Sequence, residues 1–119
     1  MKQITNIAVQ GDICLVDFNP TIGNEIKKIR PAIIINGDFS IVLDLKIVAP
    51  ITSWKDDFEN IWWLVKVMPD KFNNLDAISA VNCYQIRCIS NQRIIKIIGK
   101  EEKELENIIA TSQNCIEIV

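Results

Sequence analysis

Arg30 is the residue whose type and position most directly suggest chemistry, because it lies between a basic loop and an apolar segment. Pro31 biases Arg30 away from a helix and towards an extended backbone, and strand alternation then places the guanidinium on an apolar face. A guanidinium in that position needs an anion. Glu25 or Asp17 can supply one in a structural ion pair, or a substrate phosphate can be held by the planar guanidinium. The residues alone leave both interpretations open.

Two further segments place polar side chains beside apolar ones. Thr52 and Ser53 follow Ala49-Pro50-Ile51, and a Thr-Ser pair at the end of a strand is typical of a turn or a cap. Residues 84–87 read Tyr-Gln-Ile-Arg. The tyrosine can stack on a nucleobase, or it can lie partly buried with its hydroxyl in a hydrogen bond.

The chain contains no histidine, and this absence excludes several mechanisms. It rules out the usual serine or cysteine triad, a zinc site with histidine ligands and a ribonuclease mechanism that uses two histidines. No two of the four cysteines have a two-residue ligand spacing, and three lie in apolar patterns. We therefore expect buried free thiols, with no metal site and no cofactor. These cysteines are Cys14, Cys83, Cys88 and Cys115.

The formal net charge of −2 argues against an indiscriminate nucleic-acid binder, but the charges are segregated along the chain. Residues 26–37 contain three cations and residues 77–100 contain four, and neither stretch contains an acid. A modest basic surface of this kind fits a short single-stranded RNA, whose binding needs only a few phosphate contacts. Solvated lysines and arginines at strand edges are the alternative explanation.

The elements that must position these residues are mainly strands. The 119 residues include 24 isoleucines and 8 valines, and β-branched side chains favour half-buried sheets. Alternation and turn residues predict strands at 12–18, 29–36, 43–52, 61–68, 94–98 and one or two within 77–90. The 3.6-residue period of apolar residues predicts an amphipathic helix over 101–114, with acidic residues in its first turn. We expect one small, barrel-like, mainly β domain over residues 1–119.

Neither a membrane span nor a secretory leader is indicated. No apolar run reaches the roughly 18 to 20 residues that a spanning helix needs. Residues 1–9 lack a basic start followed by an unbroken apolar core. We therefore expect a cytoplasmic protein.

The order of the motifs resembles the MazF/PemK family of toxin endoribonucleases. Residues 11–25 read GDICLVDFNPTIGNE and lead into Arg30-Pro31, which is similar to the opening signature of that family. Residues 49–53 are similar to its APLTS segment, and residues 84–87 are similar to its DQIR segment, with Tyr84 replacing the acid. Residues 97–102 are similar to the junction before its last helix. There the capping serine is absent, so that Gly99-Lys100 is expected to open the helix.

The resemblance implies a small SH3-like or CcdB-like β-barrel with a C-terminal amphipathic helix, acting as the toxin of a type II toxin-antitoxin system. It implies metal-independent, sequence-specific cleavage of single-stranded RNA to 2′,3′-cyclic phosphate and 5′-hydroxyl ends, which inhibits growth. The implied partners, besides RNA, are a second copy of the chain in a homodimer and a small DNA-binding antitoxin. The acidic, disordered tail of that antitoxin would cover the RNA-binding surface.

The resemblance also assigns roles to residues. Arg30 stabilises charge and can donate a proton, Thr52 contacts the scissile phosphate, and Glu25 or Asp17 is a hypothetical base. The expected catalytic set is Arg30, Thr52 and Glu25. The expected RNA-binding residues are Asp17, Asn19, Thr21, Lys27, Lys28, Ser53, Tyr84, Gln85 and Arg87.

Two other functions compete with this interpretation. A gyrase poison of the CcdB type shares the barrel, but its Trp-Gly-Ile end is replaced here by Ile116-Glu117-Ile118-Val119. A catalytically degenerate family member that binds RNA or antitoxin is suggested by Tyr84. The retained Arg30, Thr52 and Glu25 favour the enzyme.

Overall fold

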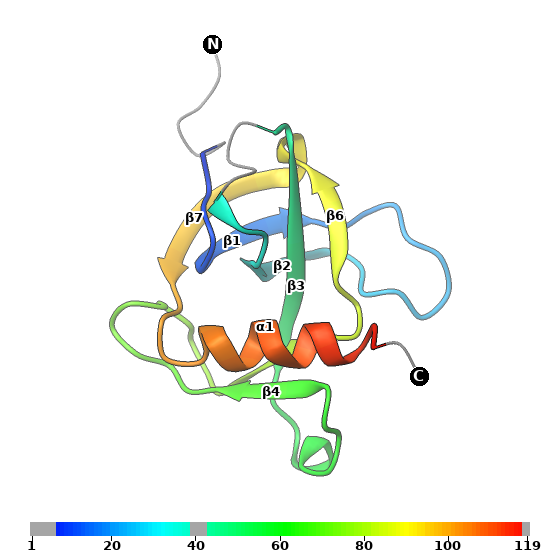
Figure 1. Ribbon diagram of the computed structural model, residues 1–119, viewed down its shortest axis with the longest axis vertical. Helices are drawn as coiled ribbons and strands as arrows, with labels where there is room; N and C mark the ends of the chain where they lie inside the picture. Colours follow the sequence, from blue (N-terminus) through cyan, green and yellow to red (C-terminus); the bar gives the residue numbers. More distant parts are fainter. Residues whose placement is uncertain (1–6, 39–42, 118–119) are drawn as a thin grey trace.

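Strands dominate the computed structural model, which describes residues 7–38 and 43–117 (Figure 1). Its single α-helix follows the last strand and crosses one end of the sheet. This arrangement confirms the predicted mainly β fold with a C-terminal helix. The strands are β1 (Asp12–Asp17), β2 (Ile29–Ile34), β3 (Leu45–Ser53), β4 (Leu64–Val67), β5 (Ser79–Asn82), β6 (Arg87–Ser90) and β7 (Ile94–Lys100). The helix is α1 (Leu105–Asn114), and the 3-10 turns η3 (Asp56–Phe58) and η4 (Asn91–Arg93) lie between strands.

The long strand β3 connects the two parts of the sheet. The strand order is β4-β5-β3-β2-β1-β7, and β6 pairs with β3 outside this path. The first half of β3 pairs with β6, from Leu45 to Val48, and its last three residues, Ile51 to Ser53, pair with β5. All of these pairings are antiparallel. A single strand therefore carries its C-terminal residues, including Thr52, from one part of the sheet into the other.

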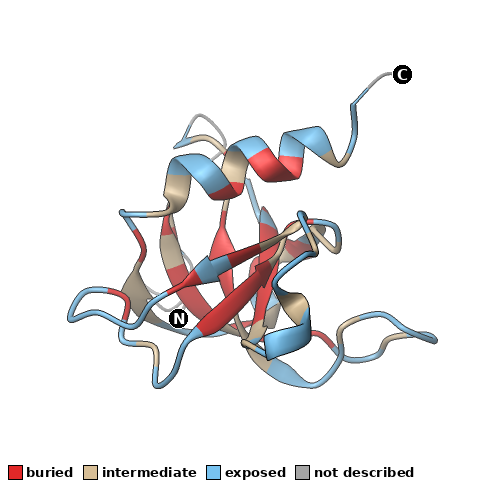
Figure 2. Cartoon of the chain, turned by 90° about the horizontal axis from the view of Figure 1, so that it is seen from below, coloured by how far each residue is buried: buried red, intermediate tan, exposed pale blue. Residues whose placement is uncertain are grey.

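Both faces of the central strands are covered, which explains why the isoleucine run in β2 does not alternate with polar residues. Successive residues of β2, Ile33 and Ile34, are both fully buried but belong to different core clusters. The first cluster contains Ala8, Cys14, Val16, Phe18, Ala32, Ile34, Val48, Ile89 and Ile94. The second contains Ile13, Ile33, Ala49, Ile51, Val65, Val67, Val81, Cys83 and Ile108. Figure 2 shows the buried side of α1 turned towards the strands, where Ile108 joins the second cluster.

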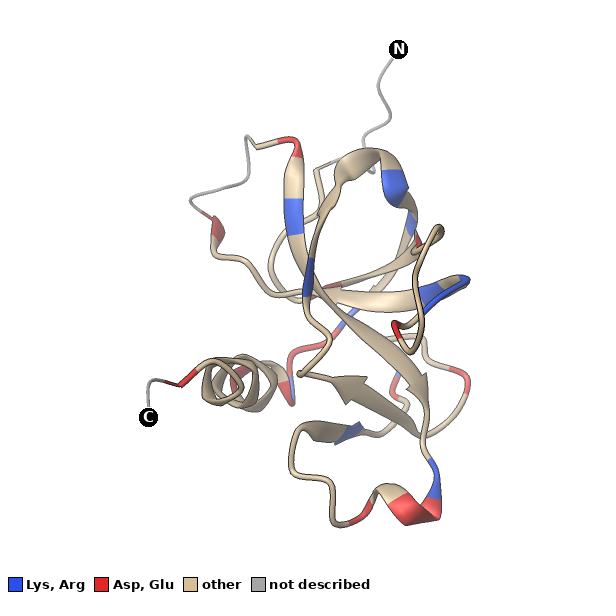
Figure 3. Ribbon diagram, turned by 90° about the vertical axis from the view of Figure 1, so that its right-hand side faces the viewer, with Lys and Arg blue, Asp and Glu red and all other residues tan. Residues whose placement is uncertain are grey.

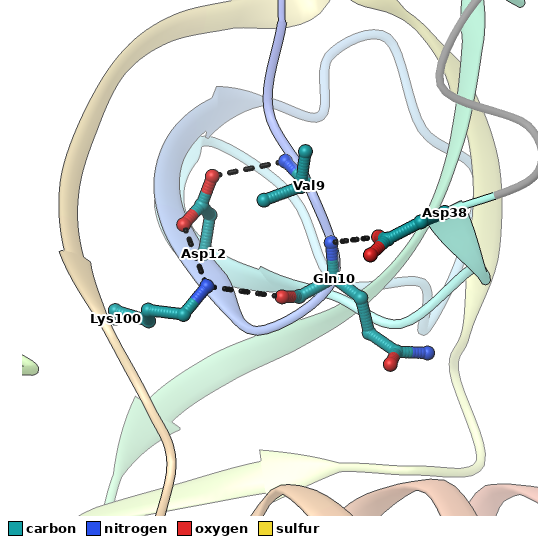
Figure 4. Close-up of polar contacts among 5 residues, drawn as sticks. All are labelled: Val9, Gln10, Asp12, Asp38 and Lys100. Atoms are coloured by element: carbon teal, nitrogen blue, oxygen red, sulfur yellow. Dashed lines mark hydrogen bonds and ion pairs between the residues drawn. The ribbon is translucent and has the colours of Figure 1, made fainter.

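Polar contacts hold the start of β1 against the end of β7. The carboxylate of Asp12 accepts a hydrogen bond from the Val9 backbone N–H at 2.9 Å and pairs with Lys100 Nζ at 3.5 Å (Figure 4). Lys100 also donates to the Gln10 carbonyl at 3.3 Å, and the Gln10 backbone N–H donates to Asp38. The GD pair of the opening motif thus has a structural role at this junction.

The predicted start of the C-terminal helix is wrong. The helix α1 begins at Leu105, and β7 continues to Lys100, so Gly99-Lys100 does not open the helix. A Cβ on Gly99 would overlap the backbone carbonyl of Asn73, which explains the glycine. Of the acidic residues that were predicted to lie in the first turn, Glu106 alone does so.

Glu101, predicted to lie in the first turn of the helix, precedes the helix and lies in the interior. Its side chain is 2% exposed. One carboxylate oxygen accepts from Asn73 Nδ2 at 2.9 Å, and the other accepts from the Glu104 backbone N–H at 2.9 Å. Because the first four backbone N–H groups at a helix start lack partners within the helix, this carboxylate satisfies one of them, that of Glu104.

The remaining differences from the predicted elements are small. The strand expected at 61–68 is shortened to β4, and the segment 77–90 divides into β5 and β6 as expected. Cys14 and Cys83 are buried free thiols as predicted, whereas Cys88 is exposed and Cys115 is half-buried. Within the described ranges, α1 is too short to cross a bilayer, and no other helix is long and apolar enough to do so.

Candidate functional site

The register of β2 and β3 brings Arg30 and Thr52 together. Ala32 pairs with Pro50 at the end of this antiparallel ladder, so the next pair on the same face consists of Arg30 and Thr52. Arg30 Nη1 donates a hydrogen bond to Thr52 Oγ1 at 3.2 Å. Arg30 Nε donates to the carbonyl of Lys27 at 2.9 Å. The guanidinium is therefore oriented at two of its nitrogens, and Nη2 has no hydrogen-bond partner in the described part of the chain.

The ion pair considered for Arg30 does not form. The Asp17 carboxylate accepts from the Asn19 backbone N–H at 3.0 Å, and the Glu25 carboxylate accepts from the Ile22 backbone N–H at 2.5 Å. Among residues 7–38 and 43–117, no carboxylate lies within ion-pair distance of Arg30. Of the two interpretations left open for Arg30, the structural ion pair with Glu25 or Asp17 is not formed by the described residues. The guanidinium charge stays uncompensated by a protein carboxylate, as a site for an external anion requires.

Arg30 and Thr52 lie in a cleft of about 350 Å³ with converging polar groups. Its polar lining consists of Lys28, Arg30, Thr52, Ser53, Asp76 and Ser79. Ile29, Pro31, Ile51, Leu75 and Ala77 complete the lining. We call this the Arg30 cleft. Two cations, three hydroxyls and one carboxylate around a small concave surface provide donors for a phosphate and an acceptor for a proton.

A second cleft, of about 390 Å³, contains the residues of the Tyr-Gln-Ile-Arg segment. Gln85 Oε1 accepts from the Ile26 backbone N–H at 2.6 Å, and Gln85 Nε2 donates to the Asn24 carbonyl at 3.4 Å. Arg87 Nη1 donates to the Phe18 carbonyl at 3.0 Å. These contacts hold the loop between β1 and β2 against the turn between β5 and β6. The lining is Phe18, Asn24, Glu25, Ile26, Pro50, Tyr84, Gln85, Ile86 and Arg87.

Residues of β3 line both clefts, and Pro50 and Thr52, two positions apart on the same face of the strand, line one cleft each. Pro50 lines the second cleft and Ile51 lines the Arg30 cleft. Figure 3 shows Lys and Arg positions distributed over the sheet and the loop at its edge, whereas the η3 turn with Asp56 and Asp57 is acidic. The negative net charge thus coexists with cations on the strands and loop that form the clefts.

Comparison with known proteins decides the family. The family model described as PemK-like, MazF-like toxin of type II toxin-antitoxin system matches residues 9–112. This chain belongs to that family. The match confirms the resemblance inferred from the order of the motifs. A search of curated proteins finds none that matches this PemK/MazF-family toxin.

Solved structures of other toxins share the fold of this PemK/MazF-family toxin. The Mycobacterium tuberculosis toxin MazF-mt6 is 23% identical with a TM-score of 0.69, and the match covers 91% of this chain and 98% of that one. MazF from Deinococcus radiodurans is 18% identical with a TM-score of 0.70, over 92% and 93% of the two chains. A mycobacterial endoribonuclease in complex with its cognate antitoxin is 13% identical with a TM-score of 0.69, over 92% and 94%. These TM-scores show a common fold.

The predicted site residues of the PemK/MazF toxin do not all lie together. Lys28, Arg30, Thr52 and Ser53 line the Arg30 cleft, whereas Glu25, Tyr84, Gln85 and Arg87 line the second cleft. Asp17 and Asn19 line a third cleft together with Arg93. Thr21 and Lys27 line none of these three clefts, although the Lys27 carbonyl helps to orient Arg30.

Tyr84, which replaces the family's acid, is exposed and borders two clefts. It lines the second cleft, and its ring lies 5.9 Å from that of Trp63 between centroids. Trp62, Trp63 and Tyr84 also line a separate aromatic cleft near the end of α1. The tyrosine is 66% exposed, so of the two alternatives left open by the sequence the partly buried ring does not apply.

Sequence reasoning missed Asp76 and Ser79 of the Arg30 cleft. Both lie in the stretch from Trp54 to Ser79, where the resemblance to the family is poorest. Their position follows from the pairing of Ser53 with Ser79 in the β3–β5 ladder. Nothing in the local sequence indicates that pairing, because it joins segments of the chain that are distant in sequence.

Proposed function

We propose that this toxin is a metal-independent endoribonuclease that cleaves single-stranded RNA at specific sequences and thereby inhibits growth. The observation that carries the proposal is the oriented guanidinium of Arg30, held by Thr52 Oγ1 and the Lys27 carbonyl and unpaired with any described carboxylate. Membership of a family of type II toxins supports it. The mycobacterial structure named as an endoribonuclease, with a TM-score of 0.69, supports it further.

The reaction suits a protein without histidine, because RNA supplies its own nucleophile. The ribose 2′-hydroxyl attacks the adjacent phosphorus, and the products are a 2′,3′-cyclic phosphate and a 5′-hydroxyl. The protein has to align the reacting groups, accept and donate protons, and place donors where negative charge develops. Arg30 and Thr52 are proposed as those donors, with Lys28 and Ser53 beside them in the same cleft. Arg30 is a poor base, since its guanidinium stays protonated.

The second cleft is the proposed path for the flanking nucleotides. Arg87 offers a cation and Gln85 an amide, and the exposed ring of Tyr84 offers a stacking surface. The roles of Asp17, Asn19, Thr21 and Lys27 in RNA binding remain predictions of the resemblance. Glu25, the predicted third catalytic residue, lies in this second cleft, and its carboxylate contacts the backbone of its own loop.

We further propose that the toxin acts as a cytoplasmic homodimer that a cognate antitoxin inhibits. An acidic peptide and an RNA are both anions, so a peptide bound over Lys28, Arg30 and Arg87 would exclude the substrate. Relatives support this partner, because solved structures include a mycobacterial endoribonuclease with its cognate antitoxin and MazE-MazF of Deinococcus radiodurans.

The experiment that tests the proposal is cleavage of a long unstructured RNA in EDTA, with sequencing of the cut ends and a chemical test for cyclic phosphate. The parent should cut at discrete sites, and Arg30→Ala should reduce single-turnover cleavage at least about 100-fold, the loss seen when a transition-state donor is removed. Lys103→Ala is the matched control, because Lys103 is exposed and lies outside the Arg30 cleft and the second cleft.

Two results would contradict the proposal. An Arg30→Ala variant that cuts at the parental rate would refute the role of the guanidinium. A folded, antitoxin-free parent that cuts no RNA would favour a degenerate binding protein, and a supercoiling assay would then test the gyrase alternative.

A further inference from the structure

We infer that Asp76 is the general base of the Arg30 cleft, a role that neither the family motifs nor the sequence indicates. The inference rests on the proposed function, because it concerns the same reaction in the same cleft. It assigns Asp76 to the 2′-hydroxyl side of the scissile phosphate, and Arg30 with Thr52 to the phosphoryl oxygens.

Asp76 is the one carboxylate among the described residues that line the Arg30 cleft. The two acids that the sequence offered as bases lie elsewhere: Glu25 lines the second cleft and Asp17 lines the third. Each of those carboxylates also accepts a backbone N–H of its own loop. A general base must come within hydrogen-bond reach of the proton that it removes, so location comes before any other criterion.

The backbone on the N-terminal side of Asp76 is held by a buried polar network. Asn73 is fully buried, and its side-chain oxygen accepts from the Leu75 backbone N–H at 3.1 Å. Its amide nitrogen donates to Glu101 and to the Met68 carbonyl, each at 2.9 Å. Leu75 itself packs against the second core cluster. The residue before Asp76 is therefore fixed both by packing and by hydrogen bonds.

The C-terminal side is held equally well. Ser79 Oγ donates to the Ala77 carbonyl at 2.9 Å, and the Trp54 backbone N–H donates to the Ile78 carbonyl at 3.0 Å. The chain then enters β5, where Ser79 pairs with Ser53 of β3. The backbone on both sides of Asp76 is thus held in place. A catalytic group needs such support if its position is to be the same in every turnover.

The Asp76 side chain is available for chemistry. It is exposed, and it has neither a hydrogen-bond nor an ion-pair partner within the described parts of the chain. The other charged groups that line the cleft are Lys28 and Arg30, both cationic. No second carboxylate is among the described residues that line the cleft, and the unshared electron pairs of Asp76 are not occupied by donors from the described residues.

The proton and electron balance of the step is simple. Asp76 takes the proton of the 2′-hydroxyl while the bond between O2′ and phosphorus forms. The bond between phosphorus and O5′ breaks, its electron pair stays on O5′, and O5′ takes up a proton from solvent to become the 5′-hydroxyl. Arg30 and Thr52 stabilise the charge on the phosphoryl oxygens during this exchange. The protonated Asp76 then returns its proton to solvent, and no oxidant, metal or further reactant is consumed.

The test compares Asp76→Asn with the parent in single-turnover cleavage of one short RNA that contains one cut site. General base catalysis typically contributes between about 100-fold and 10,000-fold, so the Asn variant should be slower by at least about 100-fold. Asp76→Glu keeps the carboxylate and should recover part of the rate. Asp57→Asn removes the same charge from the exposed η3 turn, outside the Arg30 cleft, and should cut at the parental rate.

Two further measurements separate a base from other roles. The same RNA with a 2′-O-methyl group at the cut site should bind parent and Asp76→Asn with dissociation constants within about twofold of each other. The variant lacks a group that acts in the chemical step and not in binding. An RNA whose leaving O5′ is replaced by sulfur needs no proton on the leaving group. The Asp76→Asn defect should persist on that substrate, since the 2′-hydroxyl must still be deprotonated.

Several outcomes would overturn the inference while leaving the proposed function intact. These are parental or faster cleavage by Asp76→Asn, weakened binding that accounts for the whole loss, and recovery of the variant on the sulfur substrate. The last result would assign Asp76 as an acid. A folded parent that cleaves no RNA would instead refute the proposed function itself, so the two failures are distinguishable.

Discussion

Replacing Glu101 with Gln tests whether the buried carboxylate before α1 holds the helix and the neighbouring loop together. The carboxylate uses both oxygens as acceptors, one for Asn73 Nδ2 and one for the Glu104 backbone N–H, each at 2.9 Å. A glutamine amide has one acceptor oxygen and one NH₂ group. In either orientation of the amide, the NH₂ group would therefore face a donor. The substitution keeps the shape of the side chain and changes only the hydrogen bonding.

The expected cost follows from these two contacts. A hydrogen bond to a charged group contributes about 1.5–3 kcal/mol, and a buried donor left without a partner costs about 1–3 kcal/mol. Because Glu101 is 2% exposed, water offers little compensation. We expect Glu101→Gln to lower the free energy of unfolding by about 2–3 kcal/mol, since one of the two contacts is lost and a repulsive one replaces it. Glu101→Ala, which loses both contacts and leaves a cavity, should cost about 3–5 kcal/mol.

Urea denaturation followed by tryptophan fluorescence measures the effect, with Glu102→Gln as the matched control. Glu102 is the exposed neighbour of Glu101, so its variant should stay within about 0.5 kcal/mol of the parent. A Glu101→Gln variant as stable as the Glu102→Gln control would refute the assignment of two donors to one carboxylate. Unchanged NMR chemical shifts of the Asn73 side-chain amide in Glu101→Gln would refute the same assignment.

Two other predictions concern packing and pH. Gly99→Ala should destabilise the protein by about 1–3 kcal/mol in the same urea assay, because its Cβ would overlap the Asn73 carbonyl and lie 2.8 Å from the Phe72 carbonyl oxygen. The control is Gly23→Ala, which has open space around its Cβ and a φ of +61°, so it should lose only the cost of a left-handed backbone. Equal losses of stability in the two variants would argue against the overlap at Gly99. Burial raises the pKa of the Cys14 thiol from 9.0 to about 12 and that of Cys83 to about 11. As the pH rises above 9, each thiol therefore ionises in the unfolded chain before it ionises in the folded one, which favours the unfolded chain. The free energy of unfolding should fall by about 1.4 kcal/mol per pH unit for each thiol. Cys14→Ala should remove about half of that slope in reducing buffer between pH 9 and 11, and a slope that is unchanged would exclude Cys14 as its source.

Local patterns were sufficient for the strands, and the resemblance to the family singled out Arg30 and Thr52. The β-branched composition, the turn residues and Pro31 predicted β1, β2 and β3 within a few residues, because alternation and turn chemistry depend on near neighbours. The order of the motifs identified the family that the model match confirms. Arg30 and Thr52 were both named from the sequence.

Contacts between distant segments decided the rest. The helical position expected for Glu101 was wrong, because its buried carboxylate contacts Asn73, 28 residues earlier, which no helical period can reveal. The helix start differs for a similar reason, since the Lys100 backbone N–H donates to the Phe72 carbonyl at 2.9 Å and β7 continues to Lys100.

The sequence by itself determined that this chain forms a mainly β toxin fold, that it has no histidine for catalysis and that it carries Arg30 and Thr52. Only the tertiary structure decided that the register of β2 and β3 places those two side chains 3.2 Å apart, and that the β3–β5 ladder brings the loop with Asp76 into the same cleft. The physical reason is that residue types and short-range periods are local properties. A cleft is formed by strands that pair across long separations in the chain, and their register sets which side chains meet.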